Sequence, residues 1–164
     1  MWVQEGQDQL FYYRVAGVAV TDTQVLLQRA EIDEFWALPG GRVELGETAQ
    51  AALVREMQEE MQARVTVGPL LWVVENFFTY QKYRVHELGL YFQIQLPDES
   101  RLWAEHFSGL ENDQFIVPYQ IKLYFQWFPR QVKVLTALPV LPVFLQQGLA
   151  KLPETTVHIL NDER

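Results

Sequence analysis

Residues 41–63 read GRVELGETAQAALVREMQEEMQA, and residues 55–60 within them form the acidic cluster REMQEE. On a helix, at about 100° per residue, Glu56, Glu59 and Glu60 fall within an arc of roughly 100°. Three carboxylates on one face repel one another, so the face is either freely solvated or neutralised by a cation. The adjoining arc predicts a surface packed against a core, because it holds Leu53, Val54, Met57 and Met61. A bound divalent cation is the better explanation for charges beside a packed surface.

The residues ahead of this helix predict a loop and a helix start. Thr48 is a candidate N-cap, since its hydroxyl can accept a hydrogen bond from the first turn. Gly40, Gly41 and Gly46 allow the backbone to turn tightly or to approach a ligand closely. The segment therefore reads as loop, helix and loop.

The order and spacing of these residues resemble the signature of the Nudix hydrolases. Each part is common alone, but the combination is hard to reach by chance. The resemblance rests on Gly41, Glu47, Arg55, Glu56, Glu59 and Glu60.

The resemblance implies a site for Mg²⁺ or Mn²⁺ at a pyrophosphate. It places the metal on Glu56, Glu59 and Glu60, with Gly40 beside them, and it makes Arg55 the residue that orients the carboxylates. Sites built of oxygen ligands suit such hard cations, and the chain has 0 cysteines to recruit a softer metal.

The end of the motif departs from the family pattern. Where the family has a glycine and then a bulky aliphatic residue, this chain has Gln62 and Ala63. Glycine would end the helix in a left-handed conformation, which glutamine adopts less readily. We expect an altered helix exit with a longer last turn.

Length and composition bound the class of protein. A chain of 164 residues that is 49% hydrophobic can bury one sizeable core, so residues 1–164 are predicted to form a single domain. The net charge of −8 disfavours nucleic acid polymers and anionic membranes as partners. Residues 1–10 lack the features of a signal peptide, and no segment approaches the roughly 18 apolar residues of a membrane span. We expect a cytoplasmic protein and keep a homodimer open.

The remaining pattern predicts strands around the central helix. Strand-like runs rich in Val, Leu and aromatic residues occupy residues 11–20, 24–28, 65–74, 83–96 and 126–129. Residues 97–112 are predicted to be a loop, and a second helix is predicted after Pro142, ending before Pro153. The expected fold class is α+β, an α/β/α sandwich with a mixed sheet, which is the kind of fold that the Nudix resemblance implies.

Four residues near the motif are candidate substrate contacts. Arg29 ends the strand QVLLQR, and the family often has an arginine near this point on a phosphate; a solvated surface role is the alternative. Trp36 can stack on a base or pack in the core. Arg14 interrupts an apolar strand and faces either the cleft or solvent. Gly41 permits close approach of a ligand to the backbone.

Catalysis also needs a base that removes a proton from the attacking water. Glu87 is the first candidate, because a charge in the middle of an apolar strand is costly without a partner; a solvent-facing strand position is the alternative. By alternation it shares a face with Gly89, which would leave room for a ligand. Glu75 is the second candidate, while His86 points to the opposite face and is interpreted as structural.

The predicted function is hydrolysis of a phosphoanhydride in a nucleoside diphosphate linked to another moiety, with Mg²⁺ or Mn²⁺. The substrate is a small nucleotide: a nucleotide sugar such as ADP-ribose, a dinucleoside polyphosphate, or a damaged nucleoside triphosphate. The alternative is a Nudix-like domain that binds a nucleotide as a sensor without turnover.

Overall fold

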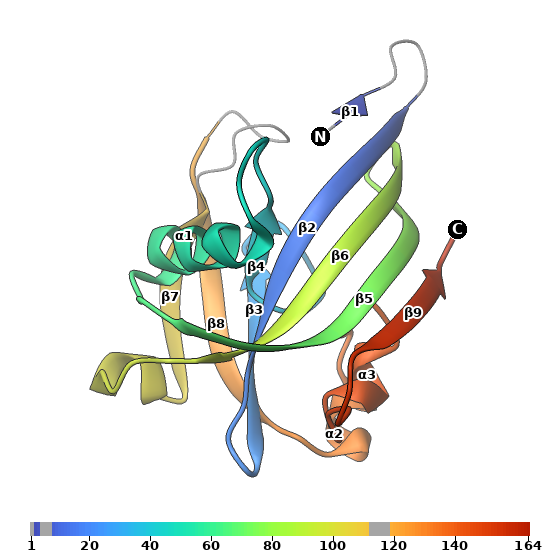
Figure 1. Cartoon of the computed structure of the whole chain (residues 1–164). Coiled ribbons are helices and arrows are strands. Elements are labelled where there is room, and N and C mark those ends of the chain that lie inside the picture. The colour runs from blue at the N-terminus through green and yellow to red at the C-terminus, as the bar shows by residue number, and fades with distance from the viewer. Residues whose placement is uncertain (1, 4–7, 112–118) are drawn as a thin grey trace.

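The structure is a computed structural model that describes residues 2–3, 8–111 and 119–164 (Figure 1). Its helical segments are α1 (Ala49–Met61), η1 (Ser100–Trp103), α2 (Val132–Ala137) and α3 (Leu145–Gly148). Its strands are β1 (Trp2–Val3), β2 (Gln9–Ala19), β3 (Gln24–Ala30), β4 (Gly40–Arg42), β5 (Thr66–Tyr80), β6 (Tyr83–Gln95), β7 (His106–Glu111), β8 (Ile121–Pro129) and β9 (Val157–Asp162). Within these residues no helix is both long and apolar enough to cross a membrane.

The strands form two sheets. The larger sheet has the order β1-β2-β6-β5-β9, and β4 pairs with β2. It is mixed, because β2 runs parallel to β6 and β5 parallel to β9, whereas β5 and β6 are antiparallel. The smaller sheet has the order β3-β8-β7. Helix α1 lies on one side of the sheets, and α2 and α3 lie on the other (Figure 1). The predicted α+β class with a mixed sheet is confirmed.

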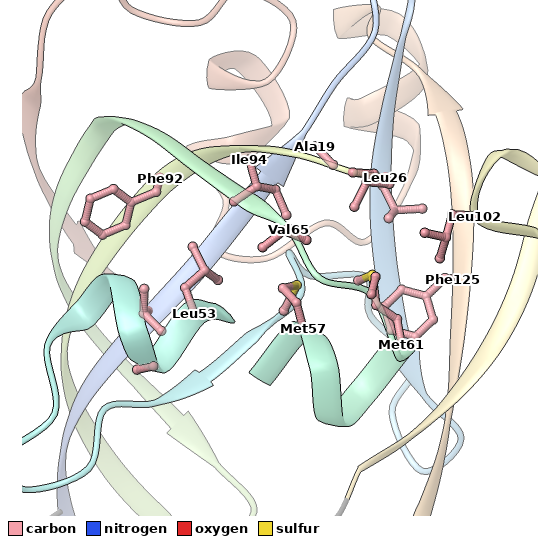
Figure 2. Close-up of a cluster of buried hydrophobic side chains, with 14 of the residues drawn as sticks. Ala19, Leu26, Leu53, Met57, Met61, Val65, Phe92, Ile94, Leu102 and Phe125 are labelled. Carbon is pink, nitrogen blue, oxygen red and sulfur yellow. The ribbon is translucent and has the colours of Figure 1, made fainter. Parts of the chain in front are cut away.

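The apolar stripe of α1 fills a core between the two sheets. Leu53, Met57 and Met61 are buried, as their spacing predicts, and Val54 packs at the edge of the same cluster. Figure 2 shows these side chains against Phe92 and Ile94 of the larger sheet and Leu26 and Phe125 of the smaller one. Because this face is fixed by packing, the carboxylates on the neighbouring face are fixed with it.

Both ends of α1 are capped by identifiable contacts. The Thr48 hydroxyl accepts a hydrogen bond of 3.2 Å from the amide of Ala51, as an N-cap should. At the other end Gln62 adopts the left-handed conformation, with φ 53° and ψ 35°. The expected longer last turn is therefore wrong. The carbonyls of Met61 and Gln62 each accept a hydrogen bond from Arg101, at 2.8 and 2.9 Å, which satisfies the helix end without a glycine.

The second half of the chain differs most from the expectations. The predicted loop at residues 97–112 contains η1 and β7, and its last residue lies outside the described residues. The strand predicted at 126–129 begins at Ile121. The helix predicted after Pro142 is the short α3, while α2 and β9 were not predicted. These elements are short, and packing against distant parts of the chain decides them rather than local periodicity.

We expect Gln62→Gly to raise the free energy of unfolding by up to about 1 kcal/mol, because glycine removes the cost of a positive φ. Thermal or urea unfolding measures the change. Gln58→Gly, at an exposed position within the same helix, is the control and should lower stability by about 1 kcal/mol. An unchanged or lower stability for Gln62→Gly would contradict the inference that the positive φ of Gln62 is strained.

Candidate active site

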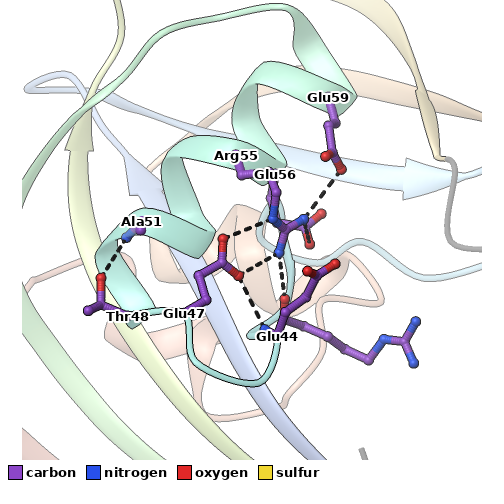
Figure 3. A network of polar contacts seen from close by, with 8 residues as sticks. Glu44, Glu47, Thr48, Ala51, Arg55, Glu56 and Glu59 are labelled. Atoms are coloured by element: carbon purple, nitrogen blue, oxygen red, sulfur yellow. Dashed lines mark hydrogen bonds and ion pairs between the residues drawn. The ribbon is translucent and has the colours of Figure 1, made fainter.

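Arg55 organises the acidic motif by binding three carboxylates and one carbonyl (Figure 3). Its Nε and Nη2 donate to the two oxygens of Glu47 at 3.0 and 2.9 Å, a bidentate arrangement. Its Nη1 donates to Glu56 at 2.8 Å and to Glu59 at 3.4 Å. Its Nη2 also donates to the carbonyl of Arg42 at 3.0 Å. The guanidinium therefore ties the loop before α1 to the carboxylate face of the helix.

The ion pair with Glu47 was not among the predicted site contacts. The hydrogen bonds from Arg55 lower the pKa of Glu47, and Glu47 in turn raises the pKa of Arg55. Glu47 also accepts a hydrogen bond of 3.2 Å from the amide of Glu44. Its position in the motif was a usable signal, because it lies eight residues before Arg55 and just ahead of the N-cap.

Glu56 lies directly against the backbone of Gly41. A Cβ atom placed on Gly41 would overlap the Glu56 carboxyl group, so any larger residue here would displace that carboxylate. Glu56 is buried, and burial raises its pKa even though Arg55 opposes the shift. The close approach predicted for Gly41 is thus made by a side chain of the protein itself.

Glu60 is the most unusual carboxylate in the described chain. It is 2% exposed, and neither of its oxygens has a hydrogen-bonding partner among the described residues. Burial, and then the nearby charges of Glu111 and Glu56, raise its pKa well above the ordinary value. A buried carboxylate without a donor is costly, so its oxygens are suited to a cation.

The donor set fits a hard divalent cation, but the carboxylates are not gathered around one point. Among the described residues no three acidic, histidine or cysteine side chains form a ready metal-binding group. Glu59 is turned toward Arg55 and is largely exposed, whereas Glu56 and Glu60 are buried. All three glutamates offer oxygen ligands. The two Glu60 oxygens, which lack a hydrogen-bonding partner among the described residues, would gain most from a bound cation.

A cavity of about 490 Å³ opens beside this motif. Gly40, Gly41 and Arg42 of β4 line one end, next to Glu56. Its floor is one face of the larger sheet, and the lining residues there are Tyr12, Arg14, Ala16, Asn76, Phe78, Tyr80, Glu87 and Tyr91. The smaller sheet contributes Arg29 and its neighbours. The cavity thus lies beside the acidic motif and is lined by the arginines Arg14, Arg29 and Arg42.

Glu87 and Arg14 both face this cavity. Glu87 is 5% exposed and accepts a hydrogen bond of 3.3 Å from the Asn76 amide. Burial raises its pKa, while the charge of Arg14 and the Asn76 amide oppose the shift. Burial also lowers the pKa of Arg14, but Glu87 and the other nearby acidic groups outweigh it and leave that pKa raised. Arg14 donates to the carbonyl of Leu38 at 3.2 Å, so it points inward, not to solvent.

Arg29 and Trp36 are in contact, but of the two only Arg29 lines the cavity. The Arg29 guanidinium lies over the Trp36 ring at 5.3 Å and the Tyr124 ring at 5.8 Å, and its buried Nε lacks a partner among the described residues. Trp36 is not among the residues that line the cavity, and it packs edge-on against Phe128 at 4.8 Å. Arg29 therefore faces the cavity, and Trp36 packs behind its guanidinium.

The other strand positions lie apart from the cavity. Glu75 is on the opposite face of the sheet from Glu87 and contacts His158 at 2.8 Å. His86 stacks on Phe77 at 4.4 Å, which fits a structural role. The space predicted beside Gly89 is not open to a ligand, because a Cβ there would lie 2.7 Å from the ring of Tyr91.

Glu111 is a carboxylate of this region that sequence reasoning missed. It lines the cavity at the end of β7, and its charge raises the pKa of Glu60 and of Glu56. Gly109 makes this possible, since a Cβ at that position would collide with the Glu60 carbonyl and push β7 away from α1. The alternating pattern of β7 was the available signal, but it was interpreted as a loop.

Comparison with known proteins agrees with the fold and the motif. The family model for the NUDIX domain matches residues 12–136. This chain belongs to that family, the Nudix hydrolases.

Individual relatives match only parts of the chain. It is 41% identical over 85 residues to a putative 8-oxo-dGTP diphosphatase of Mycobacterium tuberculosis, covering 46% of this chain and 60% of that protein. It is 36% identical over 62 residues to a putative ADP-ribose pyrophosphatase of Bacillus subtilis, covering 38% of this chain and 30% of that protein. The crystal structure of a UDP-X diphosphatase has a TM-score of 0.58 at 22% identity, over 93% of this chain and 68% of that one, and shares the fold.

The buried Glu60 predicts a pH-dependent stability in metal-free buffer. Because its folded pKa is raised, its carboxyl favours folding below the ordinary value of 4.5, and this contribution is lost as pH rises through the folded pKa. Glu60→Gln, which stays neutral, should therefore melt at a higher temperature than the wild type at pH 8, with the gap closing below pH 4.5.

Glu59→Gln is the matched control, because the Glu59 side chain is 46% exposed. It should follow the wild type across the pH range. Equal melting of wild type and Glu60→Gln at pH 8 would contradict the assigned cost of burying this carboxylate.

Proposed function

We propose that this chain hydrolyses a phosphoanhydride bond in a nucleoside diphosphate linked to another moiety, and that it needs Mg²⁺ or Mn²⁺ to do so. The observation that carries the proposal is the pair of buried carboxylates, Glu56 and Glu60, beside a cavity that also holds Arg14 and Arg29. Anionic and cationic groups of this kind match a metal and a diphosphate placed next to each other. Membership of the Nudix family supports the same activity.

In this proposal the glutamates hold the metal, and the arginines orient them or bind phosphate. Glu56 and Glu60, with Glu59 and the backbone of Gly40, would hold the cation, which when bound would neutralise the diphosphate and lower the pKa of water. Arg55 keeps Glu56 and Glu59 oriented, since it donates to both. Arg14 and Arg29 can bind phosphate oxygens from the cavity wall.

Glu87 is the proposed base for the attacking water. It lines the cavity, and burial raises its pKa, which makes the ionised carboxylate a stronger base than an ordinary one. Glu111 is the second candidate, because it lines the same cavity beside Glu60. Glu75 is not supported, since it lies on the other face of the sheet.

The substrate class follows from the family and the cavity together. The relatives named above include enzymes named for 8-oxo-dGTP, ADP-ribose and UDP-X. We therefore propose a small nucleotide, as a triphosphate, a dinucleoside polyphosphate or a nucleotide sugar. A nucleic acid polymer and a membrane are not proposed as partners, because the net charge is −8. A cytoplasmic location and a homodimer belong to the same proposal.

Binding without turnover was the alternative. The feature that favoured it was the altered end of the motif, but Gln62 keeps the left-handed helix exit that a glycine would give. No structural observation now favours the sensor function over catalysis.

A panel of nucleoside triphosphates, dinucleoside polyphosphates and nucleotide sugars, assayed with Mg²⁺ or Mn²⁺, tests the function. We expect metal-dependent release of a phosphate-containing product from at least one substrate, and Glu56→Gln should lower kcat by at least about 10²-fold because it removes a charged metal ligand. Product identity by chromatography and mass spectrometry is the measurement. Undiminished turnover by Glu56→Gln, or by wild type in chelator, would contradict the metal-dependent mechanism.

The base is tested by a series of three nearly isosteric variants. Glu87→Gln should lower kcat by roughly 10²- to 10⁴-fold, as loss of a general base does, while metal-induced stabilisation persists. Glu75→Gln, on the opposite face of β5, should keep the wild-type rate. If Glu111→Gln loses the activity and Glu87→Gln retains it, the base is Glu111.

A further inference from the structure

One wall of the cavity comes from residues beyond the part of the chain that matches the family. The NUDIX match ends at residue 136. Leu141, Pro142, Leu145 and Glu163 lie after it, and all four line the cavity. Strand β9 brings the last of them into place by pairing in parallel with β5 at the edge of the larger sheet (Figure 1). The residues of this wall therefore lie outside the segment that the family model describes.

A continuous row of hydrogen bonds connects this wall to Glu87. The Asn161 amide donates to the Glu163 carboxylate at 2.9 Å and to the Asn76 oxygen at 2.8 Å, and the Asn76 amide donates to Glu87 at 3.3 Å. Because an ionised carboxylate can only accept hydrogen bonds, Asn76 must turn its NH₂ group toward Glu87, and Asn161 must turn its NH₂ group toward Glu163. Asn76 and Asn161 are 5% and 9% exposed, which means that these bonds replace water and hold the side chains in place.

The Glu163 carboxylate is itself held at the cavity rim. Its Oε1 accepts from the Asn161 amide and from the backbone amide of Val143, both at 2.9 Å. Within the described part of the chain, both of its hydrogen bonds end on that one oxygen. The second oxygen is left to accept a donor from a ligand, beside the apolar surface of Leu141, Pro142 and Leu145.

Within this wall, Glu163 lies across the larger sheet from the acidic motif. Gly41 pairs with β2, and β2, β6, β5 and β9 follow in order across the sheet. Three spacings of about 4.8 Å separate β2 from β9, or about 14 Å in all. A diphosphate bound at Glu56 and Arg14 would thus extend its remaining group across the sheet toward Glu163.

From this arrangement we infer that the wall formed by Leu141, Pro142, Leu145 and Glu163 binds the nucleobase of the substrate, with Glu163 accepting a hydrogen bond from a base N–H group. The inference rests on the proposed function, since it takes the diphosphate to lie at the motif. A flat ring suits the three apolar side chains, and its N–H edge suits the carboxylate oxygen. A sugar would present several hydroxyls to a wall that offers one acceptor, so a base fits better.

Glu163→Gln is the informative variant. The Asn161 and Val143 amides are both donors, so the glutamine oxygen must stay on them and its amide nitrogen takes the place of the free oxygen. The structural bonds survive, but an acceptor becomes a donor. Asp162→Asn is the matched control: it removes the same charge from the adjacent residue, which pairs with Arg164. Thermal unfolding checks that both variants are folded.

The measurement is the Kd of the four common nucleoside 5′-monophosphates and of ribose 5-phosphate, by calorimetry, which needs no turnover. We expect Glu163→Gln to weaken at least one nucleotide by about 10-fold or more, the loss of one hydrogen bond to a charged acceptor. Ribose 5-phosphate should bind the variant and the wild type alike, and Asp162→Asn should change neither ligand.

Three outcomes would overturn the inference: unchanged nucleotide affinity in Glu163→Gln, an equal loss for ribose 5-phosphate, or no measurable binding of any nucleotide to the wild type. The second outcome would assign the wall to a sugar instead. A wild type that binds nucleotides through Glu163 but cleaves no substrate in the panel would contradict the proposed function alone.

Discussion

The acidic motif depends on the hydrogen bonds and ion pairs of the Arg55 guanidinium. It joins a loop residue, Glu47, to two helix residues, Glu56 and Glu59, and to the carbonyl of Arg42. Its planar donors fix directions as well as charge, so the loop cannot shift without breaking several charge-assisted bonds. The position of β4, and with it the near end of the cavity, follows from this contact.

Packing and charge oppose each other along α1. The apolar stripe packs the helix against both sheets, and that placement forces Glu56 and Glu60 out of water. Arg55 compensates the first of these carboxylates directly, whereas the second has no hydrogen-bonding partner among the described residues and the charge of Arg14 offsets its burial only in part. A site that buries charge in this way is unstable by itself and prepared for a cation, which is the usual relation between strain and function.

The larger sheet links this motif to the far wall of the cavity. Its strands carry Arg14, Glu87 and Asn76 on one face, and the edge strand β9 adds Asn161. Because each amide in the row donates toward a carboxylate, the row has a single consistent arrangement. Glu87, the proposed general base, and Glu163, in the wall proposed to bind the nucleobase, therefore belong to one hydrogen-bonded network, although they lie in distant segments of the chain.

The sequence by itself determined the helix, its N-cap, its buried stripe and the acidic motif, because those features depend on residues three to eight positions apart. It also singled out Glu87 as a carboxylate in the middle of an apolar strand, but the tertiary structure decided that this side chain is buried. Only the tertiary structure decided which groups meet it. Glu111 approaches Glu60 because β7 packs against α1, and Asn161 bonds to Asn76, 85 residues away in the chain, because β9 pairs with β5. Tyr91 fills the space beside Gly89. Such contacts arise from sheet register and packing between elements, and no local periodicity encodes them.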